Sequence, residues 1–141
     1  MDADGYEIIR RDRNRNGGGV ALYIRSSINY RTRLNLMLGN LETITVEVQK
    51  PRAKAFLIQT WYRSPNALNE VFDEFEKCIQ KMNFEDKEII CLGDFNCDWF
   101  QLALTTSSVT KKLFKLTEVY QLQQIYTNYE QFSNVYLPSF Y

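Results

Sequence analysis

The feature that most limits the possible folds is a helical pattern placed between two short apolar segments. Residues 55–62 (AFLIQTWY) and 86–92 (DKEIICL) are rich in the apolar and aromatic residues that favour strands. Between them, over residues 67–82, large apolar side chains recur at the spacing of an amphipathic helix. Asn66 precedes that helix and can cap its exposed backbone amides. The segment 86–92 is apolar on both faces, so we expect it at the centre of a sheet.

Two further strand patterns lie upstream. In residues 41–48 (LETITVEV) the side chains alternate, with the apolar ones on one face and Thr43, Thr45 and Glu47 on the other. This segment is expected to pair with residues 55–62 as an antiparallel pair with one face buried. Residues 6–11 form another expected strand, followed by a tight reversal at three consecutive glycines, since glycine accepts positive φ at little cost. The triplet lacks phosphate-loop spacing and precedes a strand, so a phosphate-binding loop is not predicted.

The order of these segments indicates the fold class. Apolar residues from Val109 to Tyr120 mark a second helix after the strand at 86–92. Hairpin strands followed by strand–helix–strand–helix predict an α/β or α+β layered domain, in which helices pack on a mixed sheet. A length of 141 residues suits one domain, and the longest apolar run, residues 20–24, is too short to span a membrane. Three cysteines form no CxxC pair and no even disulfide set, which favours reduced intracellular thiols.

Charge is unevenly distributed along the chain, although the net charge is zero. Seven arginines and one acid, Asp12, lie between Arg10 and Arg33, whereas residues 116–141 contain no lysine or arginine. The arginine-rich stretch is compatible with contact to a phosphate backbone. It is equally compatible with a solvated edge hairpin, whose charges discourage strand-to-strand aggregation. The sequence alone leaves both interpretations open.

Asp94 and Asn96 follow the apolar strand directly, separated from it by Gly93. If the strand continues, residues two apart project to the same side, and Gly93 leaves room for a ligand or a neighbouring loop. A carboxylate there can orient and deprotonate water or bind a divalent cation, and a carboxamide can donate to a phosphoryl oxygen. A turn is the more common explanation, because both residue types bond to nearby backbone amides. The spacing alone does not distinguish the two.

Four segments resemble the endonuclease/exonuclease/phosphatase superfamily in their order and intervals: GGGVALYI, LETITVEV, WYRSPN and EIICLGDFNCDW. The chain is most similar to the endonuclease domain that non-LTR retrotransposon polyproteins carry upstream of their reverse transcriptase. The resemblance implies a DNase I-like α/β fold, an incomplete four-layered sandwich of mixed sheets with flanking helices. It also implies a division into a partial domain, residues 1–124, and a divergent tyrosine-rich tail, residues 125–141.

The same resemblance implies a phosphodiesterase that nicks DNA with Mg²⁺ or Mn²⁺, with neither a small-molecule cofactor nor a membrane partner. Asp94 resembles the aspartate that orients and activates water. Asn96 resembles the asparagine that supports the phosphate and the aspartate, and Tyr62 the tyrosine that contacts the scissile phosphate. Asp94 and Asn96 are also the candidate metal ligands. Arg63 and Asn66 are candidates for phosphate or nucleic-acid contact. Each has a structural alternative: Tyr62 as a packed strand-end aromatic, Arg63 as a surface residue, and Asn66 as the helix cap.

The family also uses a metal-binding glutamate on an early strand and a histidine near its C-terminus. Both are expected to be missing here, because the chain starts after that strand and has no histidine. Ser64 also replaces a proline that the family often has. We therefore expect a weakly active or inactive fragment, a decayed or mis-bounded copy whose reading frame changes near residue 124. Two alternatives stay open: an active phosphodiesterase in which Glu42 or Glu47 binds the metal, and a non-enzymatic nucleic-acid-binding module that uses the arginine-rich stretch.

Overall fold

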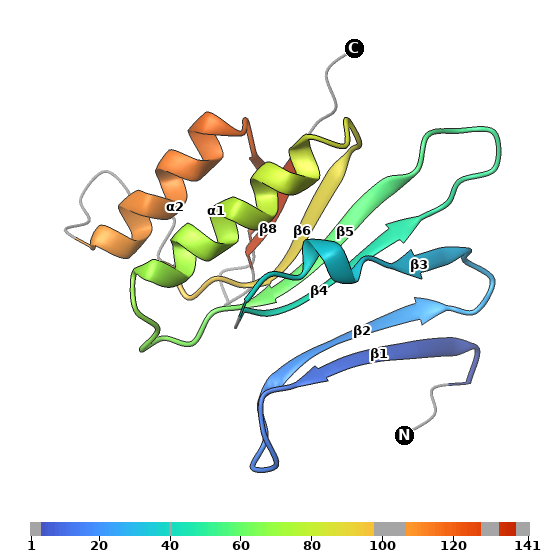
Figure 1. The fold of residues 1–141 in the computed structure, drawn as a ribbon, viewed down its shortest axis with the longest axis horizontal. Helices are drawn as coiled ribbons and strands as arrows, with labels where there is room; N and C mark the ends of the chain where they lie inside the picture. The colour runs from blue at the N-terminus through green and yellow to red at the C-terminus, as the bar shows by residue number, and fades with distance from the viewer. Residues whose placement is uncertain (1–3, 40, 98–106, 128–132, 138–141) are drawn as a thin grey trace.

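A computed structural model of the chain describes residues 4–39, 41–97, 107–127 and 133–137. In chain order its elements are β1 (Tyr6–Asp12), β2 (Gly19–Arg25), β3 (Tyr30–Thr32), the 3₁₀ helix η1 (Leu34–Leu36), β4 (Glu42–Val48), β5 (Phe56–Tyr62), α1 (Glu70–Asn83), β6 (Ile89–Asp94), α2 (Ser108–Val119), β7 (Gln123–Thr127) and β8 (Ser133–Leu137). They form a two-stranded sheet, β1–β2, and a six-stranded sheet in the order β3–β4–β5–β6–β8–β7 (Figure 1).

The six-stranded sheet is mixed, as the order of the sequence patterns predicts. β4 and β5 are antiparallel, whereas β5 and β6 are parallel, because α1 carries the chain back across the sheet between them. β6 lies between β5 and β8, which confirms that the apolar segment before Gly93 is central. β8 pairs with β6 and β7 pairs with β8, both antiparallel. The α/β fold class predicted from the sequence is therefore confirmed.

Both helices cover one face of the large sheet (Figure 1). The core on that side is built around Trp61 of β5, whose ring stacks on Phe75 of α1 with centroids 4.1 Å apart. Phe72 and Phe95 meet the same indole edge-on at 5.3 and 4.9 Å. Edge-on and stacked aromatic contacts add to the free energy of burying large apolar rings. This aromatic cluster fixes α1 against the end of β5 where Tyr62 follows.

The β1–β2 hairpin lies over the opposite face of the large sheet, and a second apolar cluster fills the space between them. Ile24 of β2 packs there with Ile44, Val46 and Val48 of β4. The apolar alternation predicted for β4 is confirmed, but the prediction that only one face of the pair is buried is wrong. Thr43 and Thr45 are fully buried, and Glu47 is 3% exposed. Layers on both sides of the sheet exclude water from both faces of β4.

The start of α1 differs from the prediction. The helix begins at Glu70, because residues 64–67 form a turn in which the amide of Ala67 donates to the carbonyl of Ser64 at 3.0 Å. Asn66 therefore does not cap the helix, and this prediction is wrong. Asn69 precedes the first helical residue, yet its side chain donates to Ser108 Oγ at 2.9 Å instead of capping. The predicted second helix is confirmed as α2, with Ser107 as its N-cap.

The C-terminal strands were not predicted, because residues 125–141 show no clear alternation. β7 runs across the proposed boundary at residue 124, and that division of the chain stays a prediction. Cys78, Cys91 and Cys97 are free, as their spacing predicts, and burial raises the pKa of Cys91 to about 12. Within the part of the chain that the structure describes, no helix is long and apolar enough to cross a membrane.

Candidate active site

Tyr62 and Asp94 lie side by side at the carboxyl ends of the parallel strands β5 and β6. They are register partners, so their side chains project from the same face of the sheet. On the other side of Tyr62, its partner on β4 is Glu42. Glu42, Tyr62 and Asp94 thus form a row across neighbouring strands. The row continues the face of β4 that carries Ile44, so it lies on the side covered by the β1–β2 hairpin.

The row opens into a groove between the hairpin and the large sheet. Tyr62 and Asp94 line this groove, which has a volume of about 320 Å³. Residues 19–22 of β2 form the opposite wall, and Thr60 and Leu92 continue the lining along β5 and β6. A phenol and a carboxylate therefore face a common opening with largely apolar walls. Tyr62 and Asp94 are thus together at this open edge, whereas Asn96 does not line the groove, and the site roles of all three stay predictions.

Gly93 is required by the packing of the two strands themselves. Its φ is +144°, and a Cβ atom at this position would lie 1.8 Å from the carbonyl oxygen of Trp61. The close approach inferred from the sequence is thus made by the backbone of β5. A side chain at residue 93 would push β6 away from β5 and separate Asp94 from Tyr62.

Asp94 and Asn96 are brought together by a turn instead of a continued strand. β6 ends at Asp94, and Asn96 has a positive φ of 47°. Asp94 Oδ1 accepts a hydrogen bond from the backbone amide of Asn96 at 2.9 Å. The carboxamide of Asn96 donates through Nδ2 to the carbonyl oxygen of Arg63 at 2.6 Å. The turn interpretation is the correct one locally, and it fixes the orientation of the Asp94 carboxylate beside β5.

Arg63 holds this turn from the interior of the protein. Its side chain is buried, and Nη1 donates to the carbonyl oxygens of Asn96 and Phe95 at 3.1 and 3.4 Å. The guanidinium carbon also lies 5.5 Å from the ring centroid of Phe72, on the α1 side of the sheet. The interpretation of Arg63 as a surface residue is wrong. Phosphate contact by Arg63, or by the exposed Asn66, stays a prediction.

Arg13 reaches the row from the hairpin, and sequence reasoning did not single it out. Its Nε and Nη2 donate to the two carboxylate oxygens of Glu42 at 2.6 and 3.1 Å. Its guanidinium carbon lies 5.4 Å from the ring centroid of Tyr62. The hydrogen bond with Glu42 raises the pKa of Arg13, with a smaller contribution from Tyr62. The sequence feature that could have pointed to Arg13 is the glycine triplet. It predicted the hairpin but not where the loop of the hairpin would lie.

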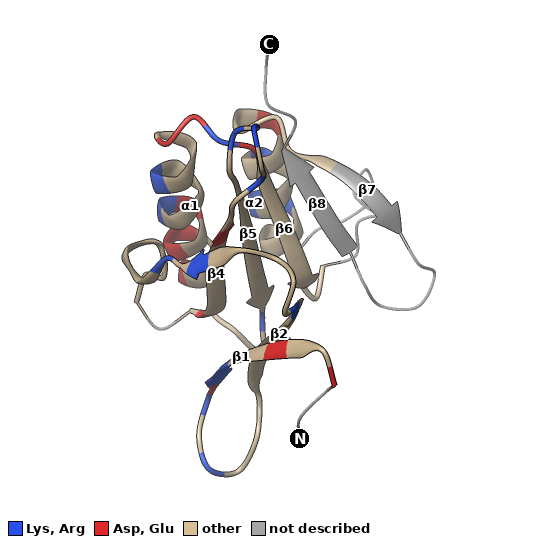
Figure 2. Cartoon of the chain, turned by 90° about the vertical axis from the view of Figure 1, so that its right-hand side faces the viewer, with Lys and Arg blue, Asp and Glu red and all other residues tan. Residues whose placement is uncertain are grey.

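Figure 2 marks where the lysines and arginines lie along the chain. Several other arginines of the arginine-rich stretch are engaged within the chain. Arg10 pairs with Asp12 on β1, and Arg11 donates to the carbonyl oxygens of Gly39 and Thr43. Arg31 and Arg33 both pair with Glu47. The stretch is therefore divided between the edge hairpin and an internal network, and contact of its arginines with a phosphate backbone stays a prediction.

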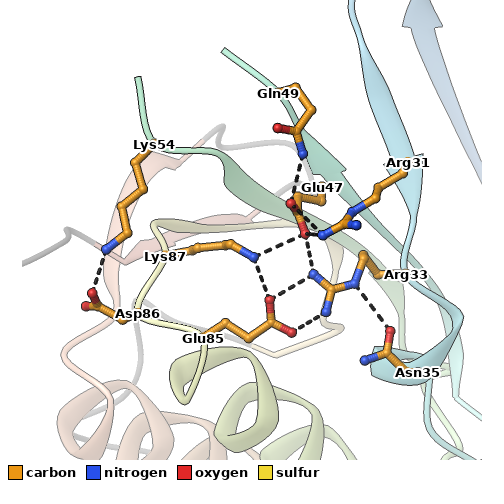
Figure 3. A network of polar contacts seen from close by, with 9 residues as sticks. All are labelled: Arg31, Arg33, Asn35, Glu47, Gln49, Lys54, Glu85, Asp86 and Lys87. Carbon is orange, nitrogen blue, oxygen red and sulfur yellow. Dashed lines mark hydrogen bonds and ion pairs between the residues drawn. The ribbon is translucent and has the colours of Figure 1, made fainter. Parts of the chain in front are cut away.

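The residues of the site do not form a complete site for a divalent cation. Among the described residues, no group of three or more histidine, cysteine, aspartate or glutamate side chains is arranged to bind a metal. Glu42 shares the row with Asp94 but is held by Arg13. Glu47 projects to the opposite face, where it is buried in ion pairs, so it cannot join Asp94 (Figure 3). Mg²⁺ usually needs further oxygen ligands in addition to one or two carboxylates.

Comparison with known proteins identifies the fold. No family model matches the sequence, and no curated protein matches it. Among solved structures, the chain is similar to the endonuclease domain of TRAS1, a telomere-specific non-LTR retrotransposon, with a TM-score of 0.73 and 13% sequence identity. The match covers 94% of this chain and 65% of that one, so this chain spans just under two-thirds of its length. The resemblance predicted from the sequence is thus confirmed for the fold, which is the mixed α/β, DNase I-like fold of a retrotransposon endonuclease domain.

Proposed function

We propose that the chain carries the phosphate-contacting and water-orienting part of a DNA-nicking phosphodiesterase of retrotransposon type, and that on its own it cleaves slowly. The observation that carries this proposal is the pairing of Tyr62 with Asp94 in one open groove at the carboxyl ends of parallel strands. Sites in layered α/β folds commonly lie at such strand ends. The similarity to the TRAS1 endonuclease domain supports DNA as the substrate.

The roles follow from the hydrogen bonds of the turn. Asp94 is oriented because Oδ1 accepts the amide of Asn96, and its carboxylate can take a proton from a water that attacks phosphorus. The phenol of Tyr62 can donate to a phosphate oxygen in the same groove. Asn96 acts as a positioning residue, since its carboxamide is engaged by the carbonyl of Arg63. The chain thus supplies the base, one phosphate donor and their support.

Slow cleavage follows from what the residues do not supply. The 141 residues contain no histidine, and the described ones include no complete set of metal ligands. Loss of a general acid or of an electrostatic donor typically lowers a rate by factors of about 10² to 10⁴. We propose that dependence on Mg²⁺ or Mn²⁺ belongs to a complete centre, of which Asp94 and Asn96 form one part.

A plasmid-nicking assay with chemical rescue tests this function. Supercoiled DNA is incubated with excess protein and Mg²⁺ or Mn²⁺, with and without imidazole, which can replace a missing histidine side chain. We expect slow nicking that imidazole accelerates and that Asp94→Ala abolishes, with a roughly tenfold loss for Tyr62→Phe. Asp86→Ala is the matched control, because this aspartate is exposed and its carboxylate pairs with Lys54 at the surface.

Two results would overturn the proposed function. Nicking that survives Asp94→Ala would place the chemistry elsewhere or in a contaminant. Nicking no faster than the Asp94→Ala background, even with imidazole, would show that the row is not a catalytic centre. Salt-sensitive DNA binding without nicking would instead support the non-enzymatic binding module, the second candidate, which the arginines of the hairpin favour.

A further inference from the structure

The loop between β1 and β2 stands at one end of the groove. Arg13 directly follows β1, and its backbone amide closes the loop by donating to the carbonyl of Gly18 at 3.1 Å. The next residues along the chain, 19–22, are those that line the groove opposite Tyr62 and Asp94. The hairpin therefore places one guanidinium beside the phenol that faces the groove.

The ion pair that holds Arg13 is partly open to water. The side chain of Arg13 is 40% exposed and that of Glu42 is 19% exposed. Ion pairs accessible to solvent contribute little net stability, because water and salt screen them. A phosphate offers the same bidentate geometry to a guanidinium and also carries negative charge. Glu42 can therefore be exchanged for a phosphate oxygen without unfolding the loop.

The glycine triplet makes room for this guanidinium. Gly18 has a φ of +83°, and a Cβ atom on it would lie 2.9 Å from Cζ and 3.0 Å from Nη1 of Arg13. A Cβ atom on Gly17, by contrast, would meet nothing within 4 Å. Gly18 thus accommodates Arg13 where it rests, in addition to shaping the turn.

We propose that Arg13 is a phosphate-binding residue for the DNA strand that enters the groove, and that Glu42 is its counter-ion until the strand arrives. The nature of the ligand rests on the proposed function, whereas the position of the guanidinium does not. On binding, Arg13 releases Glu42 and donates to a non-bridging oxygen of the backbone, beside the phosphate that Tyr62 contacts. Arg13 is a binding residue here and takes no part in bond cleavage.

DNA binding measured without cleavage tests this assignment. Fluorescence anisotropy of a labelled 20-base-pair duplex is followed in EDTA over a range of salt concentrations. We expect Arg13→Gln to raise Kd about tenfold and to reduce the slope of log K against log salt by about 0.9, the value for one phosphate contact. Arg10→Gln is the matched control, since Arg10 is an exposed hairpin arginine that also pairs with an acid, Asp12. It is expected to change Kd less than twofold.

The counter-ion role has its own test. Glu42→Gln is expected to tighten binding several-fold, and most of that gain should vanish in the Arg13→Gln background, because the two residues act as a pair. Arg13→Lys keeps the charge and is expected to keep the salt slope while losing part of the affinity. Circular dichroism of each variant shows whether it is folded. If Arg13→Gln does not fold, the loss of affinity in Arg13→Lys supplies the test instead.

The assignment fails if Arg13→Gln weakens binding no more than Arg10→Gln does, or if Glu42→Gln weakens binding. Its failure is distinguishable from that of the proposed function. Arg13-dependent binding together with no Asp94-dependent nicking would refute the phosphodiesterase and leave the phosphate site in place. Asp94-dependent nicking with Arg13-independent binding would refute the phosphate site at Arg13 and leave the phosphodiesterase in place.

Discussion

β4 carries a glutamate near each end, and the two side chains lie on opposite faces of the large sheet. Glu47 is 3% exposed and accepts hydrogen bonds from three cationic side chains and an amide, those of Arg31, Arg33, Lys87 and Gln49. Glu42 is 19% exposed, and it pairs with Arg13 at the start of the hairpin loop. We therefore expect Glu47 to stabilise the fold, whereas Glu42 can exchange its partner Arg13 for a ligand.

The network around Glu47 ties three parts of the chain together (Figure 3). Arg33 bridges Glu47 on β4 and Glu85 in the turn after α1, and Lys87 joins the same two acids at 3.2 and 2.7 Å. Buried charges are tolerated only when each has opposite charges and hydrogen bonds around it. The network therefore fixes the end of the helical layer against the sheet, far from the groove face.

The largest expected effect is on stability. Glu47→Ala leaves Arg33 and Lys87 partly buried without their main counter-ion, so we expect it to lower the free energy of unfolding by about 3 kcal/mol or more. Glu42→Ala, the matched change on the same strand, is expected to cost no more than about 1 kcal/mol. Urea unfolding followed by circular dichroism measures both. Equal losses would show that exposure does not distinguish the two carboxylates.

The same contrast predicts how stability depends on pH. Burial raises the pKa of Glu47, but hydrogen bonds from Arg31, Lys87 and Arg33 outweigh it and lower the pKa from 4.5 to about 2. A carboxylate whose pKa is lowered on folding stabilises the folded state at pH values above its ordinary pKa of 4.5. This contribution is lost as the pH falls from about 4.5 to about 2. Urea midpoints at pH 5, 4 and 3 should therefore fall more steeply for the unaltered chain than for Glu47→Gln. Parallel profiles would contradict this account.

Patterns along the sequence predict the strands and helices from β4 to α2, since local alternation and helical spacing determine these elements. The register between strands is not local. The row of Glu42, Tyr62 and Asp94 depends on antiparallel pairing on one side of β5 and parallel pairing on the other, which no short segment encodes. The position of Asp94 after an apolar strand made it a candidate, the resemblance to a family added Tyr62, and strand pairing placed Glu42 in the same row.

Polar residues explain the predictions that failed. Alternation placed Glu47 on a face assumed to meet water, but a polar side chain also suits a buried network when its partners come from distant segments, here Arg33 and Lys87. Likewise, Asn66 precedes the predicted helix with a good capping side chain, yet the turn before it delays the helix to Glu70. Composition does not reveal partners that only the folded chain brings close.

The smallest expected effect is on DNA affinity, and it comes from the two glycines of the hairpin loop. Substituting them tests the resting position of Arg13 without changing any charge. Gly17 and Gly18 both have positive φ, so alanine at either position costs about 1–3 kcal/mol of stability from backbone strain. Only at Gly18 would the new Cβ atom press on the guanidinium of Arg13, at 2.9 Å from Cζ.

Because binding requires Arg13 to leave this resting position, we expect Gly18→Ala to tighten DNA binding by up to a few-fold in EDTA and Gly17→Ala to leave the affinity unchanged. In the Arg13→Gln background, Gly18→Ala should have no further effect on Kd, because the side chain that it displaces is gone. Equal affinities for the two glycine variants would mean that the resting position of Arg13 beside Tyr62 does not matter for binding.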